Sequence, residues 1–225
     1  MAIAQANRFG IKSGMAISNF SLQETELGGN IIEWGNSIAY QTGIFYNRRL
    51  DNSLLSFQFE IDYKKVGTSF DVNDIDPNLS TPTKTTYQFE YLGMSILPRI
   101  DLLPDRVLNP NFMFGAIMDI RTDSKLLVIS ETEDNDSITQ NGFLGGDLNQ
   151  RTSKNLFGYV MAGGIEIYTK PVIITVEGRY TSLFTKVFND SVEELPLNAE
   201  NYLLKIMEDS RSNYASFLLG FNFYF

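Results

Sequence analysis

The chain has 225 residues, of which 43% are hydrophobic and 13% aromatic, and its formal net charge is -9. It contains no cysteine and no histidine, which excludes disulfides, a lipidated cysteine and the Ser-His and Cys-His arrangements of nucleophilic enzymes. No stretch approaches the roughly 18 consecutive apolar residues of a transmembrane helix. The negative charge argues against binding to nucleic acid.

The first six residues carry a possible processing signal. Ala4, Gln5 and Ala6 have the A-x-A form of a signal-peptide cleavage site, without the charged and apolar regions that precede such a site. We interpret residues 1–6 as the tail of a removed signal peptide or as the start of an expressed fragment. The simplest expectation is an exported protein that forms a single domain over residues 1–225.

Eight segments alternate between apolar and small or polar residues, as strands do when one face is apolar. They cover residues 9–17, 38–46, 55–63, 87–97, 112–120, 157–167, 174–180 and 213–225. In the third segment, Phe57 and Phe59 alternate with Gln58 and Glu60. The last segment keeps the same alternation to Phe225.

The fourth segment, residues 87–97, departs from a simple alternation. Its apolar face starts as Tyr87, Phe89 and Tyr91 and then shifts to Leu92, Met94 and Ile96. One extra residue in a strand reverses the two faces, so the pattern predicts a β-bulge near Tyr91.

The connections between these segments alternate in length. Short or modest links fall at residues 47–53, 98–111 and 169–171, and long polar links at roughly residues 19–37, 65–84, 122–155 and 182–211. This pattern is typical of bacterial outer-membrane barrels, whose turns are short on the periplasmic side and long outside. The sequence therefore predicts an all-β fold, an eight-stranded antiparallel up-and-down transmembrane barrel with long extracellular loops and periplasmic termini.

A soluble eight-stranded barrel of the lipocalin kind is the alternative. Such a barrel buries its large residues and presents polar ones to water. Here the residues opposite the large ones are mostly Gly, Ala, Ser and Gln with a few charges, a set that suits the narrow interior of eight strands. The composition therefore favours the membrane barrel.

Several stretches resemble the PorT-like outer-membrane β-barrel family. They are residues 8–20, a Gly-rich opening strand that ends in Ser-Asn-Phe, together with residues 91–97, 176–180 and 218–225. Met94 and Ser95 stand where that family usually has Ile and Pro. The resemblance implies an eight-stranded integral outer-membrane protein of a Gram-negative cell. Some members of the family serve type 9 secretion and gliding motility.

Charged residues alternate with the apolar face and are expected inside the barrel. They are Lys12, Glu60, Asp62, Lys64, Glu90, Asp119, Arg121, Glu166, Glu177 and Arg179. Buried charges must pair, so one interpretation is a salt-bridged plug that stiffens the barrel. The other is a path for protons or solutes. No catalytic residue, cofactor or designed metal site is expected, since the acidic loops lack the glycine of an EF-hand.

Two apolar groups lie in the long links. Residues 198–208 read as a short helix that carries Tyr202, Leu203, Ile206 and Met207 on one side, and Trp34 follows Ile31 and Ile32 in the first link. Residues 125–129 are expected to prolong the fifth strand. The apolar groups either close the outer mouth of the barrel or form a surface for a partner.

These observations predict a non-enzymatic outer-membrane barrel in contact with lipid. Its expected role is that of an accessory or structural subunit of an envelope or secretion assembly, of the type 9 kind, which binds partners through its loops. The alternative function is a free-standing barrel for small-solute transport or ligand binding.

Overall fold

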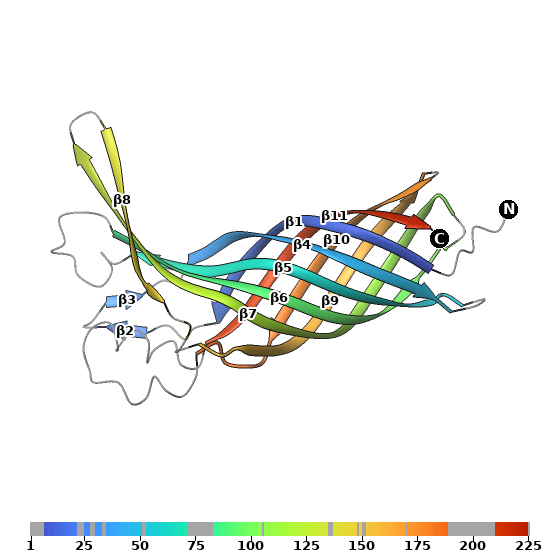
Figure 1. Ribbon diagram of the computed structural model, residues 1–225, viewed down its shortest axis with the longest axis horizontal. Coiled ribbons are helices and arrows are strands. Elements are labelled where there is room, and N and C mark those ends of the chain that lie inside the picture. Colours follow the sequence, from blue (N-terminus) through green and yellow to red (C-terminus); the bar gives the residue numbers. More distant parts are fainter. Residues whose placement is uncertain are drawn as a thin grey trace.

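The computed structural model describes residues 7–21, 25–27, 30–32, 35–50, 53–71, 83–104, 106–134, 137–147, 149, 152–169, 171–188 and 210–224. Within these ranges eight long strands form the barrel wall (Figure 1): β1 (Asn7–Ser21), β4 (Gly35–Arg49), β5 (Leu55–Asp71), β6 (Thr83–Asp101), β7 (Leu108–Asp134), β9 (Asn155–Tyr168), β10 (Val172–Leu183) and β11 (Arg211–Tyr224). Three further strands lie at one end of the barrel: β2 (Thr25–Leu27), β3 (Asn30–Ile32) and β8 (Ser137–Asp147).

The sheet closes on itself. Its strand order is β6-β5-β4-β1-β11-β10-β9-β7, and pairing of β6 with β7 completes the ring. Every pairing is antiparallel, and β1 joins β11 from Arg8 opposite Tyr224 to Ser21 opposite Arg211. The predicted eight-stranded antiparallel barrel is confirmed, and each predicted segment lies within a longer strand, apart from Phe225, which is outside the described residues.

The two ends of the barrel differ. The connections from β4 to β5, from β6 to β7 and from β9 to β10 meet at the end that holds both chain termini, which we name the short-turn end (Figure 1). The hairpin of β2 with β3 and the hairpin of β7 with β8 lie at the opposite end, which we name the far end. Residues 1–6 lie outside the described part of the chain.

Large apolar side chains cover the outer face, while the interior holds the charged side chains together with small, polar and some aromatic and aliphatic ones. Met15 is 70% exposed and Phe217 is 63% exposed, while their neighbours Ala16 and Ser216 are 1% and 6% exposed. This arrangement is opposite to that of a soluble barrel and matches a barrel whose wall meets lipid. In the described residues no helix is long and apolar enough to cross a membrane.

The irregular fourth segment has a different cause from the predicted one. Along β6 the odd-numbered residues stay inward throughout, so the side chains of Tyr87, Phe89 and Tyr91 are buried. The register with β7 shifts where Glu90 pairs with Asp123 and Tyr91 pairs with Arg121, which leaves Thr122 of β7 as the extra residue. The bulge therefore lies on β7, and the prediction of a face reversal within β6 is wrong.

Candidate functional site

The barrel interior holds a central cluster of four charged side chains. Lys12 comes from β1, Glu60 from β5, and Glu177 and Arg179 from β10, all at inward positions of their strands. Arg179 lies 2.8 Å from Glu60 and 2.5 Å from Glu177, and Lys12 lies 2.5 Å from Glu60 and 3.5 Å from Glu177. Two cations and two carboxylates are thus brought together with no excess charge.

A second group, the short-turn cluster, lies nearer the chain termini. Glu166 is 2.7 Å from Arg8 and 2.7 Å from Arg99, and Arg99 is 2.6 Å from Asp101. Asn109 donates hydrogen bonds to Asp101 at 2.9 Å and Glu166 at 3.2 Å. Glu166, which the sequence grouped with Glu177, therefore belongs to this second cluster.

Three charged members of the short-turn cluster were missed from the sequence. Arg99 and Asp101 fall in residues 98–111, which were interpreted as a connection, whereas β6 continues to Asp101. Arg8 is the second residue of β1 and lies one residue before the predicted start at residue 9. A signal for the first two was present, because Leu97, Arg99 and Asp101 continue the inward alternation and are all buried.

A third group, the far cluster, surrounds Lys64. Its ammonium group lies 3.1 Å from Asp62 on the same strand and 2.8 Å from Asp119 of β7. Lys64 also donates a hydrogen bond of 2.7 Å to the hydroxyl of Tyr214 and lies 5.0 Å from the centre of that ring. These predicted residues are therefore close together, with Tyr214 as an additional partner.

An aromatic plug, formed by Phe188, Tyr87 and Phe89, fills the barrel on the far-end side of the far cluster. Phe188, which follows β10, is fully buried and packs edge-on against Tyr87 at 6.3 Å and Phe89 at 6.1 Å between ring centroids. Residue 188 also bridges to Thr152, and the Val187 amide donates to the Ser210 carbonyl at 3.0 Å. The described part of this mouth is thus closed by Phe188, which the sequence did not single out, packed against Tyr87 and Phe89 of the fourth segment.

One predicted interior charge lies on the outer face, and another lies toward the far end of the barrel, opposite the inward-facing Tyr91. Glu90 points outward, where it pairs with Lys65 at 3.1 Å and accepts a hydrogen bond of 2.6 Å from the Tyr63 hydroxyl, so its assignment to the interior is wrong. The hydrogen bond from Tyr63 and the charge of Lys65 hold the pKa of Glu90 below its ordinary value. Arg121 lies at the far end, donating to the Asn149 carbonyl at 2.6 Å and to Thr152.

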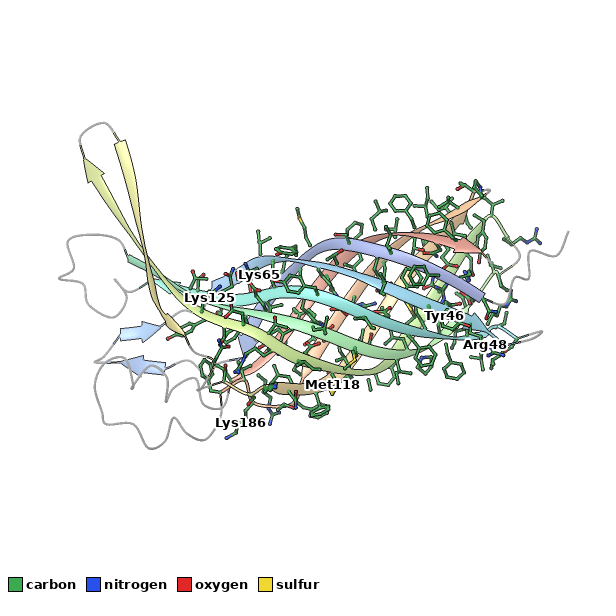
Figure 2. The ribbon with its side chains drawn as sticks, viewed as in Figure 1. Tyr46, Arg48, Lys65, Met118, Lys125 and Lys186 are labelled. Atoms are coloured by element: carbon green, nitrogen blue, oxygen red, sulfur yellow. The ribbon has the colours of Figure 1, made fainter. Side chains whose placement is uncertain are left out.

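The predicted partner residues all fall outside the part of the chain that the structure describes. Trp34 and residues 198–208, with Tyr202, Leu203, Ile206 and Met207, lie outside the described residues. The predicted strand extension over residues 125–129 is confirmed, since β7 runs to Asp134. Lys65 and Lys125 both lie toward the far end, and Tyr46 and Arg48 lie at the short-turn end (Figure 2).

The arrangement braces the barrel and leaves little free space in its interior. A cavity of about 10 Å³ lies between the central and short-turn clusters, bordered by Lys12, Arg99 and Glu177, and has room for about one water molecule. No group of three or more acidic side chains among the described residues is arranged to hold a metal ion. The geometry is therefore that of a packed, ion-paired interior.

Comparisons with known proteins agree with this architecture. A family model described as an outer membrane protein beta-barrel domain matches residues 3–189. The solved structure of the outer membrane protein OprG from Pseudomonas aeruginosa is 12% identical, with a TM-score of 0.55 over 98% of this chain and 97% of that one. No curated protein matches the chain.

Two other solved structures have lower TM-scores. Neisserial surface protein A is 15% identical, with a TM-score of 0.41 over 96% of this chain and 97% of that one. The attachment invasion locus protein Ail of Yersinia pestis is 9% identical, with a TM-score of 0.42 over 97% of this chain and 99% of that one. At these identities the likeness concerns the fold alone. The match to the family model, which covers most of the chain, shows that this protein belongs to the outer membrane protein beta-barrel domain family and is a protein of the outer membrane.

Proposed function

We propose that this chain is a non-conducting, non-enzymatic barrel that serves as an accessory or structural subunit of an envelope assembly. The observation that carries the proposal is the filled interior, in which three ion-paired clusters are stacked below an aromatic plug. The ion pair of Arg179 with Glu60 by itself joins β10 to β5 across the barrel. Because the described interior offers no wide path for solutes, we place the function of the barrel on its surface at the far end.

The far end offers a specific surface for a partner protein. Strand β7 pairs with β9 from Leu108 to Ile120. Further toward the far end, the same edge of β7 pairs with β8 from Lys125 to Asp134. In the described ranges β8 pairs with β7 alone. Its second edge therefore carries backbone N–H and C=O groups without ladder partners, which an extended segment of another protein can join as an added strand.

The orientation in the membrane follows from the family pattern and is part of the proposal. Short turns face the periplasm in barrels of this class, and long connections face outside. We therefore assign the short-turn end and both termini to the periplasm, and the β7–β8 hairpin to the cell exterior. The resemblance to the PorT-like family supports a type 9 secretion complex as the assembly concerned.

Excision of the hairpin tests this surface. Residues 128–143 are replaced by Asn-Gly, a dipeptide that favours a tight two-residue turn, because Leu127 pairs with Leu144. Wild-type and excised chains are captured from outer membranes in mild detergent, and their companions are identified by mass spectrometry. We expect a stoichiometric companion with the wild type and its loss with the excised chain. A companion retained by the excised chain would remove this surface from the proposal.

Single-channel recordings test the closed interior. Purified barrel in a planar bilayer should show no discrete conductance steps. Regular open steps would favour the alternative function, a free-standing barrel for small-solute transport. A matched control is the chain without residues 198–208, which should stay closed if the clusters rather than this segment block the path.

A further inference from the structure

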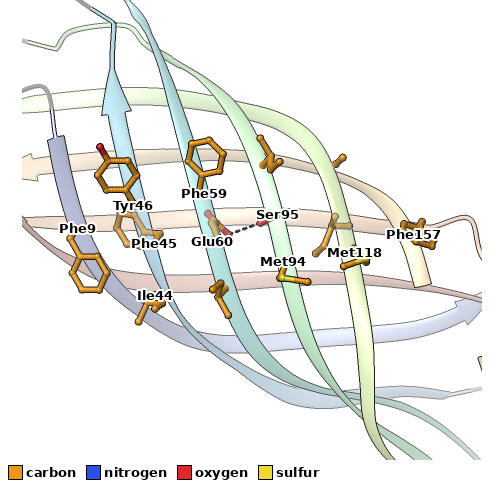
Figure 3. Close-up of a pocket in the computed structure, with 14 residues that line it drawn as sticks. Phe9, Ile44, Phe45, Tyr46, Phe59, Glu60, Met94, Ser95, Met118 and Phe157 are labelled. Carbon is orange, nitrogen blue, oxygen red and sulfur yellow. Dashed lines mark hydrogen bonds between the residues drawn. The ribbon is translucent and has the colours of Figure 1, made fainter. Parts of the chain in front are cut away.

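The outer wall of the barrel carries a long apolar groove (Figure 3). Residues that are opposite each other in the register form rows that cross the strands, and the groove runs between two such rows. One row contains Phe9, Tyr46 and Phe59, and the other contains Ile44, Ile61 and Met94. The volume of the groove is about 610 Å³.

The dimensions of the groove suit one hydrocarbon chain. Its lining residues come from six neighbouring strands, from Phe9 on β1 to Phe157 on β9. With strands about 4.8 Å apart the groove crosses about 24 Å of the wall, a length that one extended acyl chain can follow. Met94 and Met118 lie along its path, and their unbranched side chains adapt to such an occupant.

Arg48 places a positive charge beside the end of the groove that lies nearer the short-turn end of the barrel. Arg48 follows Tyr46 by two residues on the same outward face of β4, at the short-turn end (Figure 2), and its side chain is exposed. A guanidinium group binds phosphate oxygens through two parallel hydrogen bonds. The chain as a whole carries a net charge of -9, so an anion would be held here by a local contact rather than by the overall charge.

From this placement we propose that the groove is a binding site for an anionic phospholipid. One acyl chain lies in the groove, and the phosphate is held by Arg48. The site is on the lipid-facing wall and is independent of the β8 edge, so it goes beyond the proposed partner-binding role. An anionic headgroup is favoured over a zwitterionic one because it brings no cation of its own to compete with the guanidinium group.

Native mass spectrometry of the detergent-solubilised barrel tests the site. The protein is mixed with equal amounts of phosphatidylglycerol and phosphatidylcholine that carry the same acyl chains. We expect the wild type to retain one phosphatidylglycerol preferentially. The variant Arg48→Gln should retain it about tenfold less, the effect of losing one charge-assisted contact. Equal retention of both lipids by the wild type would overturn the proposal.

Matched variants separate the groove from general charge effects. Arg106→Gln removes another exposed arginine at the same end, and Lys186→Gln removes a cation at the far end (Figure 2), so both should bind lipid as the wild type does. Ala116→Phe places a ring in the groove and should reduce retention of both lipids. The proposal fails if Arg106→Gln matches Arg48→Gln, or if Ala116→Phe changes nothing. It also fails if the wild type forms a dimer through this face and Ala116→Phe abolishes that dimer.

Discussion

The guanidinium group of Arg179 makes two hydrogen bonds, of 2.8 and 3.0 Å, to the carboxylate of Glu60 on the opposite wall of the barrel. The two residues are 119 positions apart in the sequence, and both are buried. The same guanidinium group binds Glu177 at 2.5 Å, so one arginine neutralises two carboxylates. This contact ties β10 to β5 across the interior.

Replacement of this arginine should destabilise the barrel strongly. Among the described residues Arg179→Met leaves Lys12 as the one cation paired with Glu60 and Glu177, and removal of one partner from a buried pair costs about 3–5 kcal/mol. Denaturant unfolding in detergent micelles would measure the loss. The double variant Arg179→Met with Glu60→Gln should cost less than the sum of the single changes. Strict additivity would show that the two side chains do not interact.

Ser18 supplies hydrogen bonds where the ladder between β4 and β5 is interrupted. The register of these strands is interrupted between Asn36 and Gln41, and there the Ser18 hydroxyl donates to the Gly67 carbonyl at 2.6 Å and accepts from the Gly67 amide at 2.9 Å. Ser18→Ala should cost about 1–3 kcal/mol because both buried backbone groups lose their partner. Faster hydrogen exchange at the Gly67 amide would report the change. Ser13→Ala, at an outward position of the same strand, should be close to neutral.

Close packing at the β1–β11 seam requires glycine at residue 14. A Cβ atom there would overlap the Phe217 carbonyl, so Gly14→Ala should destabilise the closed barrel by about 1–3 kcal/mol. The loss of the compact, heat-modifiable band on a gel would show it. Gly178→Ala is the control, because the nearest atom to a Cβ there is 3.9 Å away. Equal effects of the two changes would argue against this account.

The aromatic plug should control access to the far end of the interior. The chain has no cysteine, so single cysteines can be labelled without background. Ser212 faces inward and is buried, and Ser212→Cys should react slowly with a charged thiol reagent. Adding Phe188→Ala should speed the reaction markedly, because the ring that packs on Tyr87 and Phe89 is gone. An unchanged rate would mean that other residues close the mouth.

The contact between Glu90 and Lys65 should make a small, pH-dependent contribution to stability. The Tyr63 hydrogen bond chiefly, with Lys65, lowers the pKa of Glu90 below its ordinary value of 4.5. A lowered folded-state pKa stabilises the protein above the ordinary value, and the effect is lost as the pH falls through the lowered pKa. Glu90→Gln should therefore cost less than about 1 kcal/mol at pH 7. At acid pH the wild type and Glu90→Gln should have the same unfolding free energy. A difference in unfolding free energy that grew on acidification would contradict the assignment.

Much of the wall could be predicted because alternation is a local property. Apart from residues 87–97, each of the eight segments places most of its large apolar side chains on one face, and a pleated strand has only two faces. Small and charged residues opposite them, such as Gly10 and Lys12, fit an interior only eight strands wide. Fold class and the inward direction of Glu60, Asp62 and Arg179 follow from that pattern.

The assignment of Glu90 failed for a physical reason. Aromatic side chains fit either the lipid-facing wall or the interior, so the alternation of Tyr87, Phe89 and Tyr91 did not reveal which face they occupy. The bulge that restores the pattern lies on β7, a neighbouring strand in space that is about 30 residues away in sequence. Nothing within residues 87–97 alone carries that information.

The sequence by itself determined the eight wall strands and, apart from residues 87–97, the chemical character of their two faces, since these depend on residues two apart in the chain. The tertiary structure alone decided which cation meets which carboxylate. Arg8 reaches Glu166 and Lys64 reaches Asp119 only because closure of the sheet sets the stagger between strands. The same closure brings Phe188 onto Tyr87 and aligns the rows of the outer groove. Contacts of this kind join residues far apart in the chain, and periodicity within one strand does not encode them.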